Sequence, residues 1–165
     1  MAFTRRSDST SSPTTYVGRW LRATLLRQPE LRERLRLTLN AGKKTGWNDD
    51  EPAVVEAACE LVLRRLFAAP DDVRAITAFV SELRIATDDD PPLGKLKTEA
   101  VIRSALGEAD VVTSNITPGQ KYLTRYLVIV FAARKLDLDE AAIDRLIAES
   151  EQIALDRGWH PPLAQ

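Results

Sequence analysis

Apolar residues recur at intervals of three and four along most of the chain, which is the spacing of one face of an α-helix. Residues 16–25 place their apolar side chains on one side of such a helix, with Arg19 and Arg22 opposite. Pro29 disfavours helical geometry in the residue before it and suits the first turn of a second helix, whose apolar stripe stops at Gly42. The pattern therefore predicts two consecutive basic helices near the N-terminus.

Five more helices are predicted from the same spacing and from residues that start or stop helices. They run from Asp49 or Asp50 to about Ala68, from Asp71 and Asp72 through Leu83, from Leu93 to Gly107, from Thr117 through Ala133, and from Asp137 to Gly158. Thr117 and Gln120 have the spacing of a capping box, as do Asp137 and Glu140. Residues 126–133 are apolar on every side, which predicts a central, mostly buried helix.

No stretch shows the strict alternation of a strand beyond a brief extended piece at Val111 and Val112. The sequence therefore predicts an all-α fold, a compact orthogonal or up-down bundle of six to seven helices. Residues 1–13 are rich in Ser and Thr and predict a disordered tail. Residues 14–160 are expected to form a single helical domain with a sub-boundary in the loop 42–50, and residues 161–165 a C-terminal tail.

The composition is typical of a globular protein, with 44% hydrophobic, 28% charged and 6% aromatic residues. A single Cys and a single His exclude a zinc finger and an intrachain disulfide. The longest apolar run, residues 127–133, is too short to cross a bilayer, so no membrane span is expected. The first residues lack the apolar segment of a secretory signal, which favours a cytoplasmic location.

Charge is unevenly distributed although the net charge is only −1. Residues 1–46 carry a net charge of +7, residues 47–120 carry −7, and the remainder carries −1. Such a separation is typical of a basic segment that binds a partner, or of two segments that pack on each other. Both interpretations stay open from the sequence.

The sequence has only weak matches to the residue patterns of phosphate-binding and metal-binding sites. Gly42 and Lys43 lack the upstream glycine and the preceding strand of a phosphate-binding loop. Glu56 and Glu60 lie one helical turn apart and are the best pair for a metal ion, but Arg64 follows Glu60 at the spacing of a surface ion pair. We therefore predict no metal site.

The nucleophile and base expected of a hydrolytic enzyme are also poorly placed. His160 lies in the C-terminal tail, where a base is not held rigidly, and Cys59 lies among small apolar residues as a core residue would. The sequence therefore predicts no catalytic residue, no cofactor and no enzymatic activity.

The remaining signal is the basic helical pair at the N-terminus. Arginines project from both helices, and Leu26 and Leu37 fall outside the apolar stripes, which is typical of a protein interface with a rim of Arg. The predicted partner-binding residues are Arg19, Arg22, Leu26, Arg32, Arg36 and Leu37. The predicted function is a non-catalytic interaction or regulatory module whose partner is another protein or a second copy. The alternatives are a nucleic-acid-binding accessory protein and an all-α metal-dependent nucleotide hydrolase.

Overall fold

The computed structural model describes residues 12–42, 50–68, 72–87 and 93–164, which form seven helices and no strand. The helices are α1 (Tyr16–Leu25), α2 (Pro29–Gly42), α3 (Glu51–Leu66), α4 (Val73–Ala86), α5 (Lys95–Ala105), α6 (Pro118–Lys135) and α7 (Glu140–Asp156). The all-α prediction is confirmed. The predicted tail as far as Ser11 and the loop residues 43–49 lie outside the described residues. None of these helices is long and apolar enough to cross a membrane.

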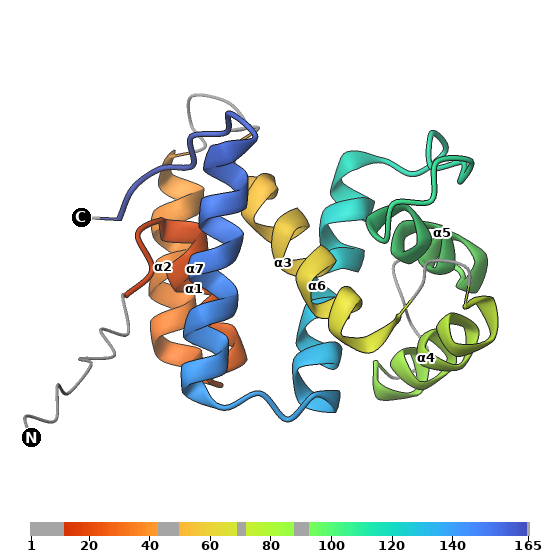
Figure 1. The fold of residues 1–165 in the computed structure, drawn as a ribbon. Helices are drawn as coiled ribbons and strands as arrows, with labels where there is room; N and C mark the ends of the chain where they lie inside the picture. The colour runs from red at the N-terminus through yellow and green to blue at the C-terminus, as the bar shows by residue number, and fades with distance from the viewer. Residues whose placement is uncertain (1–11, 43–49, 69–71, 88–92, 165) are drawn as a thin grey trace, which may run out of the picture.

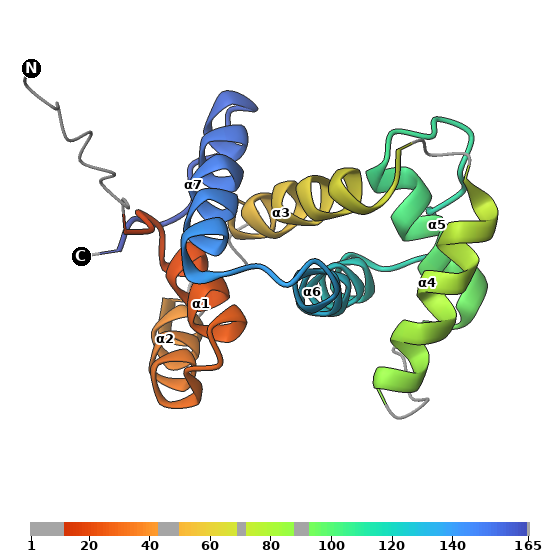
Figure 2. The same ribbon diagram turned by 60° about the horizontal axis from the view of Figure 1, so that its bottom comes forward.

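The helices form three groups side by side. α1, α2 and α7 lie at one end of the molecule, α3 and α6 in the middle, and α4 and α5 at the other end (Figures 1 and 2). α3 packs on both α6 and α7, and α1 packs on both α2 and α7. α3 is therefore the helix that joins the two ends.

The apolar core follows α3 and extends to both sides of it. Fully buried α3 side chains include Val54, Val55, Ala58, Cys59, Val62 and Leu63. Toward α4 and α6, the ring of Phe79 lies 5.6 Å from that of Phe67 and 5.1 Å from that of Phe131, both in edge-to-face geometry. Toward α1, Val17 and Leu21 close the core from the other side.

α6 begins as predicted and is mostly buried over residues 126–133. Gln120 N donates to Thr117 Oγ1 at 3.2 Å and Thr117 N donates to Gln120 Oε1 at 3.1 Å, which confirms the capping box. Ile129 is fully buried, whereas Val130 lines an open cavity. None of residues 126–133 is exposed, so the prediction of a central, mostly buried segment is confirmed.

α7 begins two residues later than predicted. Its N-cap is Asp139, which accepts a hydrogen bond from Ala142 N at 2.8 Å. Asp137 instead takes a left-handed backbone conformation, with φ 49°, just after the end of α6. Glu140 does not complete a box with Asp137, because its side chain reaches across to Arg22 of α1.

The two ends of the described chain lie together beside α1 and α7. Thr15 pairs with Leu163 in an antiparallel bridge, and Ala164 N donates to the carbonyl oxygen of Thr14 at 2.8 Å. The buried carboxylate of Glu151 on α7 accepts hydrogen bonds from both the backbone N–H and the hydroxyl of Thr14 and of Thr15. This network fixes the start of α1 against α7.

Candidate functional site

Arg22, one of the predicted contact residues on α1, is turned inward against α7. Its Nε donates to Asp144 Oδ1 at 2.6 Å and its Nη2 donates to Glu140 Oε1 at 2.5 Å. The hydrogen bond to Asp144 is the main cause of a raised pKa of Arg22, because both carboxylates favour the charged guanidinium. The prediction that Arg22 projects into solvent is therefore wrong, and its partner is α7 rather than the acidic middle of the chain.

The other two predicted residues on α1 are also engaged. Arg19 is half-buried, and its Nε donates to the carbonyl oxygen of Pro13 at 3.2 Å. Leu26 is half-buried and packs against the core. The prediction that Leu26 is exposed is wrong, because it caps the end of α1, where the chain turns and brings the side chain back under the helix.

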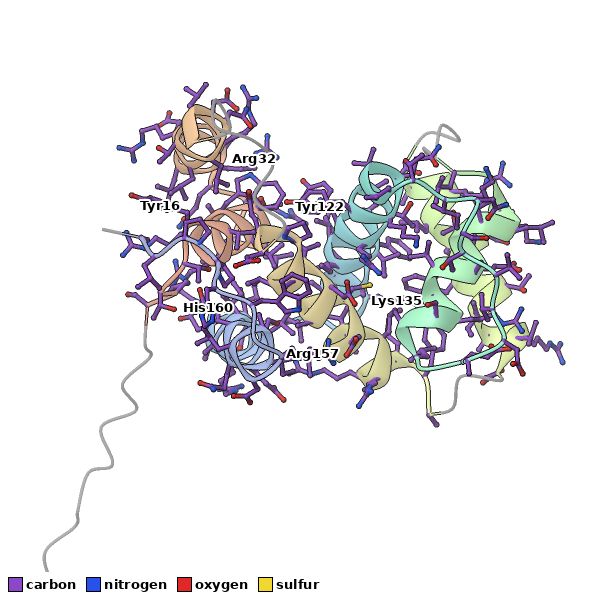
Figure 3. All side chains as sticks on the ribbon, turned by 90° about the horizontal axis from the view of Figure 1, so that it is seen from above. Tyr16, Arg32, Tyr122, Lys135, Arg157 and His160 are labelled. Carbon is purple, nitrogen blue, oxygen red and sulfur yellow. The ribbon has the colours of Figure 1, made fainter. Side chains whose placement is uncertain are left out.

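The predicted residues on α2 have a different environment. Arg32, Arg36 and Leu37 are all exposed, Leu37 at 55%, and Figure 3 shows Arg32 beside α2 on the side toward Tyr122. The Arg36 guanidinium donates to both carboxylate oxygens of Glu33, at 2.8 and 2.6 Å. This contact lowers the pKa of Glu33 and lies within α2, so it does not tie the helix to the rest of the molecule.

α2 is attached to the fold through α1 alone among the seven helices of the described chain. Leu35 is its buried leucine, and none of the described α2 side chains belongs to the core cluster around α3. A groove of about 420 Å³ lies between α1 and α2, with Leu31 and Leu35 on one wall and Arg19 and Arg22 on the other. The groove combines an apolar surface with arginine at its rim.

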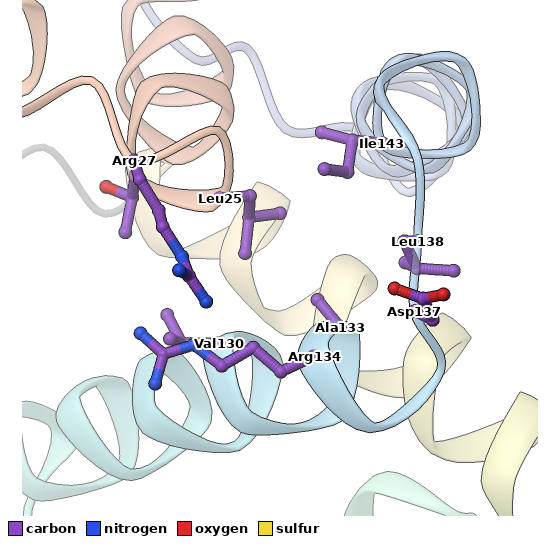
Figure 4. Close-up of a pocket in the computed structure, with 9 residues that line it drawn as sticks. Leu25, Arg27, Val130, Ala133, Arg134, Asp137, Leu138 and Ile143 are labelled. Atoms are coloured by element: carbon purple, nitrogen blue, oxygen red, sulfur yellow. The ribbon is translucent and has the colours of Figure 1, made fainter.

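Sequence reasoning missed a second arginine site on the opposite side of α1. Arg27, just after α1, and Arg134, in the last turn of α6, line two adjoining cavities of about 210 and 240 Å³. In Figure 4 the Arg27 side chain points from the end of α1 toward α6, and the Arg134 guanidinium lies along α6 beneath it. Arg32 of α2 lines the second cavity. Within the described residues, neither the Arg27 nor the Arg134 guanidinium has a hydrogen bond or an ion pair.

These two arginines gave no signal in the sequence, because 107 positions separate them and only the packing of α1 beside α6 brings them together. The contact between Trp20 and Tyr126, whose ring centroids lie 5.3 Å apart, sets that packing. One local cue existed. α1 ends without the glycine that usually follows a helix, so a residue other than Gly has to take the left-handed conformation there.

The carboxylates considered for a metal site face arginines from other helices. Glu56 Oε2 lies 3.3 Å from Arg125 Nη1 of α6, and Glu60 accepts two hydrogen bonds from the Arg157 guanidinium after α7. The sequence predicted Arg64 as the partner of Glu60. That prediction is wrong, because Arg157 reaches Glu60 from the end of α7 and binds it in bidentate geometry. In the described parts of the chain, no group of three or more His, Cys, Asp or Glu side chains could hold a metal ion.

The two candidate nucleophile and base residues lie in contrasting surroundings. Cys59 is fully buried, and burial raises the pKa of its thiol to about 12. His160 is exposed, and its backbone N–H donates to Asp50 Oδ2 at 3.0 Å. Cys59 therefore packs as a core residue, and His160 helps to hold the C-terminal segment on the start of α3.

Comparisons with known proteins give no guide to function, since no family model, no curated protein and no solved structure matches this chain.

Proposed function

We propose that the chain is a non-catalytic helical module that binds a protein partner through α2 and the groove beside it. The observation that carries the proposal is the isolation of α2. It packs on α1 alone, contributes no described side chain to the main core, and exposes Arg32, Arg36 and Leu37. A helix with this much uncovered apolar and arginine surface is typical of an interaction site.

The chemistry of the groove suggests how a partner binds. Leu31 and Leu35 provide an apolar floor for side chains of a partner helix, in the manner of helix-in-groove recognition. Arg32 and Arg36 lie on the exposed part of α2 and would orient acidic groups of the partner rather than supply most of the affinity. A second copy of this chain is one such partner.

Nucleic acid is a second candidate, favoured by three arginines near α2 that form no ion pair among the described residues. Arg27, Arg32 and Arg134 would attract phosphates. The hydrolase alternative has less support, because Glu56 and Glu60 are engaged with Arg125 and Arg157. A cytoplasmic location remains a prediction from the sequence.

Site-specific photo-crosslinking in the source cells tests the proposal. A photo-reactive amino acid replaces Leu37 on α2, and the matched control replaces Leu96 on α5, which is exposed at 79%. We expect a discrete protein adduct from position 37 and none from position 96. Mass spectrometry of the adduct identifies the partner, and a mass of twice the chain assigns it to a second copy.

Two results would overturn the proposal. The first is the same set of adducts from both positions, which would show non-specific contact. The second is nucleic acid as the adduct at position 37. In that case, binding should weaken steeply as salt rises, whereas an apolar protein interface should change little.

A further inference from the structure

The cavity between the end of α1 and the end of α6 contains two guanidinium groups that face the same space. Arg27 and Arg134 both line the two adjoining cavities there, together with Thr24 and Val130. Figure 4 shows the two side chains converging from the two helices. Like charges that converge without an acceptor repel each other, so an anion between them would stabilise the arrangement.

The backbone at Arg27 gives an independent reason to regard this cavity as a site. Arg27 has φ 56°, in the left-handed region that favours glycine, and the chain closes α1 there through Gln28 N donating to the Ala23 carbonyl oxygen at 2.8 Å. Asp137, on the wall of the same cavity, has φ 49°. α5 and α7 end in the same conformation with Gly107 and Gly158. Strain retained at a non-glycine residue is characteristic of functional sites.

The ordinary explanation for arginine at a helix end is attraction to the negative end of the helix dipole. This attraction is strongest when the guanidinium lies close to the terminal carbonyl groups of its own helix. Neither Arg27 nor Arg134 donates a hydrogen bond to a carbonyl oxygen within the described residues, and Arg27 extends away from α1 toward α6. The helix dipole therefore does not explain why the Arg27 side chain extends toward Arg134.

We propose that this cavity binds a phosphate group, either inorganic phosphate or a small phosphomonoester. Two arginines match the charge of a phosphomonoester, which is about −1.5 to −2 at pH 7, better than the single charge of a carboxylate. Each cavity is smaller than the roughly 300–1,000 Å³ of sites for drug-sized ligands, which suits a phosphate on a small body. Leu25, Val130 and Ile143 give an apolar wall for that body.

Asp137 acts against anion binding, because its carboxylate lines the cavity with the two arginines. It lies on the α7 side, and no ion pair joins it to Arg27 or Arg134 in the described structure. A carboxylate that is not paired to either arginine leaves both guanidinium groups available. It also provides a useful control, because it shares the backbone strain of Arg27 but carries the opposite charge.

Calorimetric titration of the full chain at constant ionic strength tests the proposal, with inorganic phosphate, phenyl phosphate and citrate as probes. Four variants are compared: Arg27→Gly, Arg134→Gln, Asp137→Gly and Arg64→Gln. Arg64 is an exposed residue on α3 that lines neither cavity. Arg27→Gly removes the guanidinium and suits the left-handed backbone, so its melting temperature should stay the same or rise.

We expect saturable one-to-one binding of phosphate, weakened at least tenfold by Arg27→Gly and by Arg134→Gln. Asp137→Gly should bind at least as tightly as the native chain, and Arg64→Gln should be unchanged. Tighter binding of phenyl phosphate than of phosphate would identify a phosphomonoester, and equal binding would identify the free ion. The proposal fails if no saturable binding occurs, if citrate binds as tightly as the phosphates, or if the two arginine variants bind phosphate normally. None of these results bears on crosslinking at Leu37.

Discussion

α1 and α2 are neighbouring helices that both carry arginines, and the fold uses them in opposite ways. α1 is covered by α7, and the carboxylates of Glu140 and Asp144 hold its Arg22. α2 has no such cover, and its Arg32 and Arg36 remain exposed. The positive charge at the N-terminus of the sequence is therefore divided between a folding contact and a free surface.

The difference between α1 and α2 follows from the residues that pack against each helix. The first residues of α1 meet Glu151, whose buried carboxylate receives four hydrogen bonds from Thr14 and Thr15. A carboxylate that is buried is stable only when its oxygens are well bonded, so α1 is held in one position. Among the described residues, α2 has no comparable polar contact with any helix but α1. Basic residues in a sequence do not by themselves indicate an interface.

Among the substitutions that compare α1 with α2, we expect the largest loss of stability from Gly18→Ala in α1. A Cβ atom at Gly18 would lie 2.2 Å from Glu151 Oε1 and 2.9 Å from Thr15 Oγ1, so the carboxylate has to move away from its donors. We expect a loss of about 2–4 kcal/mol in the free energy of unfolding, measured by urea denaturation.

The matched control is Gly119→Ala in the first turn of α6. Nothing lies within 4 Å of a Cβ atom there, so the same substitution should be neutral or stabilise by up to ~1 kcal/mol. Equal effects at the two glycines would show that the Glu151 network does not hold α1.

A smaller effect is expected from Arg22→Gln. The change leaves the buried carboxylate of Asp144 without its guanidinium, which costs about 1–3 kcal/mol. Arg32→Gln makes the same change on α2 and should alter stability by less than ~0.5 kcal/mol, because Arg32 is exposed. Denaturant midpoints of the two variants compare the helices directly, and similar midpoints would remove the distinction between them.

The core is covered by α1 and not by α2, and it contains the buried thiol of Cys59. We expect the free energy of unfolding to depend on alkaline pH through this thiol. An unfolded thiol ionises near pH 9 and the buried one only near pH 12, so the stability from this group is complete below pH 9 and is lost as the pH rises toward 12. At pH 10 the loss is about 1.4 kcal/mol. Denaturation at pH 8 and pH 10 should therefore show a flatter pH dependence for Cys59→Ala than for the native chain. An identical dependence would mean that the thiol is accessible in the folded state.

The fold class and most helix boundaries could be predicted from the sequence because they depend on local spacing and end residues. The capping box at Thr117 and the break at Pro29 are examples. The partners of Arg22 and Glu60 could not be predicted, since they come from α7 and from the residue just after it, about a hundred positions away in the chain or more. The convergence of Arg27 and Arg134 depends in the same way on packing that no local pattern encodes.

The exposure of the predicted contact residues could be predicted for only half of them, for the same reason. Helical spacing correctly placed Arg32, Arg36 and Leu37 on an outer face of α2. It could not show that α7 would cover the equivalent face of α1 at Arg22, or that the turn at Leu26 would fold that side chain back onto the core. Packing against other helices in the tertiary structure decides which of two similar helical faces stays exposed to solvent.

We propose that α2 provides the partner surface while α1 belongs to the fold. The most direct test is the yield of the Leu37 crosslink in a chain that also carries Arg32→Gln and Arg36→Gln, with its thermal melt measured in parallel. Exposed charges contribute little to stability, so the melting temperature should move by no more than ~2–4 °C, the shift that about 1 kcal/mol produces in a domain of this size. We predict that the crosslink falls at least tenfold under these conditions. An undiminished crosslink, or a melting temperature lowered by more than ~10 °C, would contradict the account.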